Sequence, residues 1–290
     1  MLNWAFSDWC YQSQFTCAKP CQGPLKWHEV APTCGGKAQS PINIVTKRAR
    51  IDSVLQPLTY ISYQHAFHSD IINNGHSVQV NLPDSAKIEG GNLGSTYKAL
   101  QLHFHWGAHG GPGSEHTIDG EQYPMEMHIV HIKQQYHSLA EALKDPSGVA
   151  VLGLFYQESG SSNGKYDSII NALQSIKSPG MNTTLYDLSL DSLIPPHSNL
   201  TAYYRYQGSL TTPQCDEAVV WTVFENPIPL SKQQLSAFSQ LSFADGTNMT
   251  DTFRPVQPLN GREVYRSSAV TVIFNSLLLL CSFFALSLSC

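Results

Sequence analysis

Apolar and polar residues alternate along several short stretches of the chain, and this period of two is typical of β-strands. Gly, Pro, Asn and Asp separate these stretches, as turns require. The clearest strand predictions are 77–82, 99–106, 125–133, 148–156 and 218–225. No internal repeat or low-complexity linker divides the chain. The pattern predicts a mostly β (α+β) protein built around one large sheet.

Helical patterns are few and short. Ser138 with Glu141 three residues later has the pattern of a capping box, and Ser231 begins a second short segment that runs toward 241. A third segment, 165–176, places four apolar residues on one helical face: Ile169, Ile170, Leu173 and Ile176. We therefore expect small helices at the periphery of the sheet.

Composition narrows the class of protein. The chain has 290 residues, of which 13% are charged and 10% aromatic, so it is long enough to bury a large core and is not disordered. A net charge of −5 argues against nucleic acid as a partner. Seven Cys suggest an oxidising compartment, and twelve His suggest metal or proton chemistry.

Segment 99–106 carries the candidate chemistry. Its alternation predicts one face with Leu100, Leu102, Phe104 and Trp106, and an opposite face with Gln101, His103 and His105. Two imidazoles about 7 Å apart along a strand can converge on one ion. Segment 125–133 places Glu126, His128 and Val130 on one face, so His128 would supply a third nitrogen if the two strands pair.

Three His with an open fourth position are how proteins hold catalytic zinc. Gln101 and Glu126 each precede a candidate ligand by two residues, and each can accept the spare N–H of an imidazole. A single His-x-His pair is more often a surface feature or a buried polar pair, but the third His and its acidic neighbour favour a metal site.

The other histidines receive structural or surface predictions. His131 falls on the opposite face from His128, so we expect it to be a hydrogen-bonded structural residue. Four more histidines have no motif around them and are predicted to lie on the surface: His65, His68, His109 and His137.

The two ends of the chain suggest processing. Residues 269–290 carry no charge, and small residues precede them, which is typical of a signal for a glycosylphosphatidylinositol (GPI) anchor. The sequence predicts removal of 267–290 with attachment at Ser267 or Ser268; a single membrane-spanning segment is the alternative. Residues 1–8 have no signal-peptide pattern, so we expect an N-terminal remnant whose signal peptide is missing.

Three sequons make Asn182, Asn199 and Asn248 glycosylation candidates. They are weak support for secretion, because about three would arise by chance in a chain with this many Asn.

Seven segments together resemble the alpha class of carbonic anhydrases. They occur in family order as 39–44, 73–76, 101–107, 113–117, 126–131, 206–213 and 253–257. The resemblance covers about residues 9–265, and it defines an expected domain at 9–266. It implies a twisted, mostly antiparallel ten-stranded sheet with one Zn²⁺ at the bottom of a conical cleft.

The resemblance also implies a reaction, the reversible hydration of carbon dioxide to bicarbonate and a proton by zinc-bound hydroxide (carbonate dehydratase, EC 4.2.1.1). By this resemblance His103, His105 and His128 are the zinc ligands. Thr211 and Glu115 orient the hydroxide, and His76 is the proton shuttle, which its Asn-Asn-Gly turn would leave exposed and able to swing. The substrate pocket is implied to contain Val130, Val151, Leu210, Thr212 and Trp221, with Tyr11 nearby.

Within that family the chain is most similar to the GPI-anchored, membrane-associated isozyme IV type. This implies disulfides Cys34–Cys215 and Cys10–Cys21, with Cys17 left over, and a location on the extracellular face of the cell membrane. Carbon dioxide, bicarbonate and water are the expected partners, sulfonamides and anions the expected inhibitors. A catalytically inactive, carbonic-anhydrase-like binding domain is the alternative, and hydrolysis of activated esters would be a side reaction of the same site.

Overall fold

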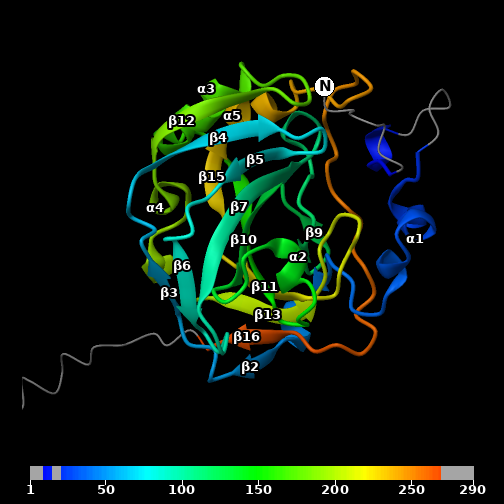
Figure 1. Ribbon diagram of the computed structural model, residues 1–290, viewed down its shortest axis with the longest axis vertical. Helices are drawn as coiled ribbons and strands as arrows, with labels where there is room; N and C mark the ends of the chain where they lie inside the picture. The colour runs from blue at the N-terminus through cyan, green and yellow to red at the C-terminus, as the bar shows by residue number, and fades with distance from the viewer. Residues whose placement is uncertain (1–8, 15–20, 269–290) are drawn as a thin grey trace, which may run out of the picture.

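One large sheet dominates the computed structural model, which describes residues 9–14 and 21–268. Within these residues the sheet has thirteen strands (Figure 1). Ten of them are neighbours in the order β12-β4-β5-β7-β10-β11-β14-β13-β16-β2, and β3, β6 and β15 pair beside this path. The predicted large, mostly antiparallel sheet is therefore confirmed, with ten strands in its main path and three more at its sides.

Five strands begin and end within three residues of the predicted segments 77–82, 99–106, 125–133, 148–156 and 218–225. The path comprises β12 (Asn182–Leu188), β4 (Phe67–Asn73), β5 (Val78–Asn81), β7 (Tyr97–Trp106), β10 (Met125–Lys133), β11 (Val149–Ser159), β14 (Val219–Phe224), β13 (Tyr203–Gly208), β16 (Tyr265–Ser267) and β2 (Arg50–Asp52). Beside it lie β3 (Leu58–Ile61), β6 (Lys87–Gly90) and β15 (Ile228–Ser231). A separate small sheet contains β1 (Asn43–Ile44), β8 (Thr117–Ile118) and β9 (Glu121–Gln122).

The α-helices are short and lie around the sheet (Figure 1). They are α1 (Trp27–Val30), α2 (Leu139–Ala142), α3 (Asp167–Leu173), α4 (Leu190–Leu193) and α5 (Lys232–Phe238). Ser231 caps α5 in a full capping box with Gln234, and Ser138 caps α2 by accepting a hydrogen bond from the Glu141 backbone N–H. The predicted peripheral helices are thus present, and two of them begin where their capping residues indicate.

A β-bulge in β7 corrects one prediction. Val130 of β10 pairs with Gln101 and His131 pairs with Ala99, so Leu100 is an extra residue in β7. Leu100 packs against the cluster that contains Val130, whereas Leu102 lies in the main core. The expectation that Leu100 shares a face with Leu102 is wrong, because the bulge changes which residues face the core.

The sheet separates two hydrophobic clusters. The larger contains Leu102, Phe104 and Trp106 from β7, and the smaller contains Val130, Val151 and Trp221 from three neighbouring strands. His103, His105 and His128 lie on the face of the smaller cluster. This rigid, buried strand pair positions the candidate site.

Two disulfides stabilise the first part of the chain, one within it and one to a distant loop. Cys34 bonds to Cys215 and Cys10 bonds to Cys21, the two pairings implied by the resemblance. Cys17 and the tail at 269–290 lie outside the described residues. Within 9–14 and 21–268, no helix has the length and apolar character needed to cross a bilayer.

Candidate active site

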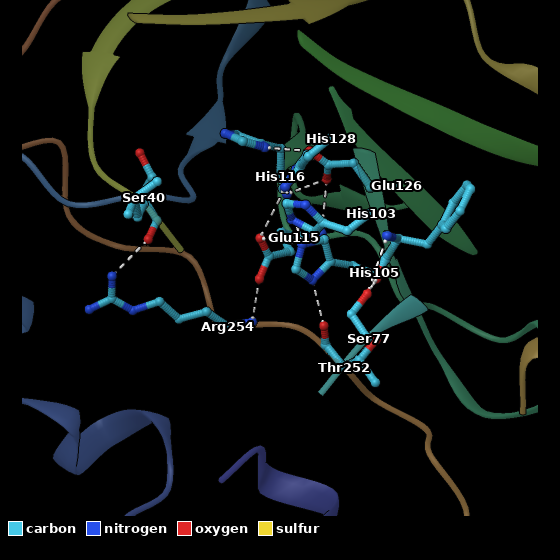
Figure 2. Close-up of polar contacts among 12 residues, drawn as sticks. Ser40, Ser77, His103, His105, Glu115, His116, Glu126, His128, Thr252 and Arg254 are labelled. Atoms are coloured by element: carbon cyan, nitrogen blue, oxygen red, sulfur yellow. Dashed lines mark hydrogen bonds and ion pairs between the residues drawn. The ribbon is translucent and has the colours of Figure 1, made fainter. Parts of the chain in front are cut away.

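Two adjacent strands bring three imidazoles together. His103 on β7 lies directly opposite His128 on β10, and His105 lies two residues farther along β7. One ring nitrogen from each of the three lies within 4.8 Å of the others, so the group could hold a metal ion. His105 and His128 are each only 1% exposed. Figure 2 shows the three rings turned toward one another.

The outer nitrogen of each ring meets an acceptor. Nδ1 of His103 lies 2.9 Å from Oε1 of Gln101, and Nδ1 of His105 lies 2.6 Å from the carbonyl oxygen of Thr252. Nε2 of His128 lies 2.7 Å from Oε1 of Glu126. Because a carbonyl or carboxylate oxygen can only accept, each outer nitrogen carries the proton. These contacts determine the tautomer of all three rings.

The inner nitrogens therefore point lone pairs at one another. Burial, followed by the neighbouring imidazoles, holds the pKa of His103 well below its usual value and lowers that of His105 to about 3. Burial also lowers the pKa of His128, so all three rings are neutral. Nε2 of His105 and Nδ1 of His128 are only 3.1 Å apart, yet neither has a proton to share.

A cation bound between these nitrogens would relieve this repulsion. Nitrogens bound to one tetrahedral zinc at about 2.1 Å lie roughly 3.4 Å apart, close to the 3.1 Å between Nε2 of His105 and Nδ1 of His128. Three neutral imidazoles are also a ligand set that suits zinc. The donor set of His103, His105 and His128 therefore fits Zn²⁺.

A second group, His116, Glu126 and His128, is also close enough for metal binding, but its atoms already bond to one another. Oε1 of Glu126 lies 2.7 Å from Nδ1 of His116 and 2.7 Å from Nε2 of His128, while Oε2 accepts the backbone N–H groups of Glu115 and His116. Burial alone would raise the pKa of Glu126, but His116 and His128 hold it well below its usual value. Glu126 is thus a saturated carboxylate that fixes His128.

Glu115 is a second buried carboxyl group beside the imidazoles. Its Oε1 accepts the backbone N–H of Arg254 at 2.8 Å, and its Oε2 lies 3.4 Å from Nε2 of His105. Burial raises the pKa of Glu115 well above its usual value, while a hydrogen bond from the Thr211 side chain acts in the opposite direction. Thr211 is only 5% exposed, and it is linked to the site through this carboxyl group.

His76 lines the same cavity of about 140 Å³ as His103, His105, Tyr11 and Thr212. Its ring stacks on Trp9, with centroids 4.1 Å apart and planes inclined by 18°. Burial lowers its pKa to about 4 in this position. The expectation of an exposed His76 is wrong for this conformation, because Trp9 covers one face of the ring.

Apolar side chains form one wall beside the imidazoles. Val130, Val151 and Trp221 are neighbours across β10, β11 and β14, and each is at most 3% exposed. Leu210 packs against the same cluster, and Nε1 of Trp221 donates to the carbonyl of Ser209. The residues expected in the substrate pocket are thus gathered next to the candidate metal ligands.

The five histidines with structural or surface predictions divide into a buried and an exposed group. His131 is fully buried, and its Nε2 lies 2.7 Å from the hydroxyl of Tyr63, which agrees with its predicted structural role. The four histidines predicted on the surface are exposed: His65, His68, His109 and His137. None of these five joins the imidazole group.

His131 should make the fold sensitive to acid. Its folded-state pKa of about 4 lies below the value of about 6.5 in an unfolded chain, so its contribution is intact above pH 6.5 and is lost as the pH falls toward 4. Between pH 7.5 and 4.5 this loss is about 2–3 kcal/mol. Between these pH values we expect the free energy of unfolding of His131→Gln, measured in urea, to fall by about 2–3 kcal/mol less than that of the wild type. An equal loss in wild type and variant would contradict this, and His65→Gln is the exposed control.

Four supporting residues were not predicted. His116 bridges Glu126 and the hydroxyl of Tyr206, which lies 2.6 Å from its Nε2. Thr252 orients His105, and Arg254 positions Glu115 through its backbone. His116, Tyr206 and Arg254 lie in the segments 113–117, 206–213 and 253–257, which carry the family resemblance. No pattern in the sequence, however, indicated which partner any of these residues contacts.

The processing candidates have different environments. The hydroxyl of Ser267 donates to the carbonyl of Thr201 and accepts the N–H of Tyr203, and Ser267 is only 3% exposed within β16. Ser268 follows it at the end of the described residues and is partly exposed. The three sequon residues Asn182, Asn199 and Asn248 are all exposed.

Comparison with known proteins gives a consistent result. A family model for eukaryotic-type carbonic anhydrase matches residues 22–268. The chain is 40% identical over 269 residues to carbonic anhydrase 4 of Rattus norvegicus, covering 91% of this chain and 85% of that protein. It is 42% identical to carbonic anhydrase 4 of Oryctolagus cuniculus (90% and 84% covered) and 39% identical to carbonic anhydrase 15 of Mus musculus (91% and 84% covered). On this match, and with three convergent imidazoles on its central strands, the chain belongs to the eukaryotic-type carbonic anhydrase family.

Proposed function

We propose that this chain is a zinc-dependent carbonate dehydratase (EC 4.2.1.1) that hydrates carbon dioxide reversibly to bicarbonate and a proton. The observation that carries the proposal is the convergence of three imidazole lone pairs, whose repulsion a cation would relieve. His103, His105 and His128 would hold the zinc. Bound there, zinc would lower the pKa of a water to about 7, a value known from carbonic anhydrase itself, and so supply hydroxide at neutral pH.

Thr211 and Glu115 would orient the nucleophile. A threonine hydroxyl has one proton to donate. If the Glu115 carboxylate accepts that proton, Thr211 can only accept from the nucleophile, which must then donate its own hydrogen to Thr211. This arrangement directs a lone pair toward the substrate and disfavours ligands that have no proton to donate. The contact between Thr211 and the Glu115 carboxyl group supports this role. Burial raises the pKa of Glu115, and a cation held by His105, whose Nε2 lies 3.4 Å from Oε2 of Glu115, would favour the ionised form that the role needs.

The apolar wall would hold carbon dioxide. The substrate is small and has no net charge, so it needs no ionic partner and suits a hydrophobic surface. Val130, Val151, Leu210 and Trp221 provide that surface beside the candidate ligands. Thr212 and Tyr11 line the adjoining cavity. Sulfonamides and small anions are the inhibitors expected of such a site.

His76 would carry the product proton to solvent. It lines the cavity together with His103 and His105, and imidazole is the side chain whose ordinary pKa is nearest to neutral. Its pKa of about 4 in the position stacked on Trp9 is too low for this task at neutral pH. We infer that His76 leaves the Trp9 stack to accept a proton.

The proposed location is the extracellular face of the cell membrane, with a GPI anchor at Ser267 or Ser268. Two disulfides within the described residues support passage through an oxidising compartment. Phospholipase release from cells, followed by mass spectrometry of the released chain, would identify the processed end and test the assignment.

Zinc content measured together with carbon dioxide hydration tests the function. We expect one zinc per chain, loss of hydration when a chelator removes it, and recovery when zinc is added back. An inactive carbonic-anhydrase-like binding domain would show no hydration at full zinc content, and that result would overturn the proposal. The same assay with an activated ester would detect the side reaction of this site.

His76→Ala tests the proton relay separately from zinc chemistry. In weak buffer we expect kcat to fall by up to about 100-fold while kcat/KM stays near the wild-type value, because hydration itself does not need the relay. Small imidazole buffers should restore kcat. Exposed His65 provides the control, since His65→Ala should leave both constants unchanged. Equal kcat of His76→Ala and wild type in weak buffer would exclude the role.

A further inference from the structure

A cavity of about 560 Å³ lies outside the active site, and the proposed reaction does not use it. It is bounded by the end of β11, the segment 161–166, the segment that follows α4, and the start of β15. Its volume is within the range of small-ligand pockets. The cavity is open to solvent, and Asn199, one of the three sequon residues, belongs to its lining.

The lining has the chemistry of a carbohydrate-binding surface. Among the described residues that form it, four prolines provide flat apolar faces: Pro195, Pro196, Pro227 and Pro229. Neutral polar side chains stand between them, including Ser161, Asn163 and Asn226, and Lys165 is the one charged residue in that set. A neutral oligosaccharide combines apolar C–H faces with hydroxyl groups, so it matches this mixture without needing charged partners.

The backbone of the sequon is held at the rim. The side-chain amide of Asn226 donates to the carbonyl of Asn199 at 2.6 Å, and the N–H of Asn199 donates to the carbonyl of Pro196 at 2.7 Å. Leu200, the middle residue of the sequon, is buried and 1% exposed. The side-chain nitrogen of Asn199 makes no hydrogen bond with any residue in the described part of the chain. The attachment atom is thus available while its backbone is fixed.

We propose that Asn199 carries an N-linked glycan and that the neutral core of this glycan lies in the adjoining cavity. Covalent attachment at the rim keeps the sugar at a high local concentration, so even weak contacts hold it in place. Asn182 and Asn248 are also exposed sequon residues, but neither lines this cavity, so glycans there would project into solvent. The inference rests on the proposed secretory route and is independent of catalysis.

Differential deglycosylation tests the proposal. The full chain, preceded by a heterologous signal peptide, is secreted from a eukaryotic cell line, and mass spectrometry follows each sequon during treatment with a peptide N-glycosidase. On the folded protein we expect release from Asn199 to be at least tenfold slower than release from Asn182 or Asn248. After denaturation the rates should become similar. An unmodified Asn199, or equal rates on the folded protein, would overturn the proposal.

Thermal unfolding supplies a second measurement. Asn199→Gln and Thr201→Ala remove the same sequon by different changes, and we expect each to lower Tm by about 2–4 °C. Asn182→Gln and Asn248→Gln are the matched controls and should leave Tm unchanged. If Thr201→Ala secretes normally and keeps the wild-type Tm, the glycan does not stabilise the fold through this cavity. Carbon dioxide hydration of all four variants should equal that of the wild type, so failure of the proposed function would be visible separately.

Discussion

His103→Ala is expected to abolish both zinc binding and carbon dioxide hydration. Loss of a residue that only supports a zinc ligand already weakens metal binding by about 10–100-fold, so loss of a ligand should cost at least about 100-fold. The alanine leaves His105 and His128 as two neutral imidazoles, too few for a catalytic zinc site. Metal analysis of the purified variant and stopped-flow hydration would measure the two losses.

The control for this variant is His109→Ala. His109 is exposed and lies just beyond β7, so its loss should change neither zinc content nor turnover. His103 is partly buried, so circular dichroism should first establish that His103→Ala is folded. A folded His103→Ala protein with normal zinc content and normal turnover would show that the ligand assignment is wrong.

Removal of the Cys34–Cys215 disulfide is expected to give the largest loss of stability. The two cysteines are 181 residues apart, and in the chain-entropy model closing a loop of that size stabilises the fold by about 5 kcal/mol. The Cys34→Ser, Cys215→Ser double variant should therefore unfold at a Tm lower by about 10–20 °C. It should also lose activity, because the disulfide fixes the loop that follows Thr211. Within that loop the Cys215 N–H donates to the carbonyl of Thr212.

The second disulfide provides an internal comparison. Cys10 and Cys21 are only 11 residues apart, so their removal should cost less, about 3 kcal/mol. The difference in Tm between the two double variants, measured by thermal unfolding, tests the loop-length argument. A larger loss for Cys10→Ser, Cys21→Ser would contradict the loop-length argument. Zinc content should be unchanged in that variant, since neither cysteine lies among the described metal donors.

The sequence was most informative where local periodicity and the site coincide. The strand-like segment 125–133 coincides with β10 to the residue, and the positions of His103, His105 and His128 predicted three imidazoles on one face if the two strands pair. These predictions succeed because side chains two residues apart in a strand share a face whatever the strand packs against. The prediction for the three imidazoles also needed the assumption that segment 99–106 pairs with segment 125–133, and β7 does pair with β10.

Contacts between distant segments could not be predicted in this way. Thr252 reaches His105 across 147 positions of the chain, and Arg254 reaches Glu115 across 139. Neither residue belongs to a periodic segment, so no pattern indicates its partner. The stack of Trp9 on His76 is similar, because it depends on a short N-terminal segment held by a disulfide rather than on any strand.

The bulge at Leu100 has a consequence for how the length of β7 can change. Before the bulge the core-facing residues have odd numbers, Tyr97 and Ala99; after it they have even numbers, beginning with Leu102. Loss of Leu100 would keep both faces in phase, since it removes the residue that has no partner of its own in β10. Loss of one residue between Leu102 and Trp106 would turn a histidine toward the core. Among natural relatives, insertions and deletions in this strand should therefore be confined to the bulge.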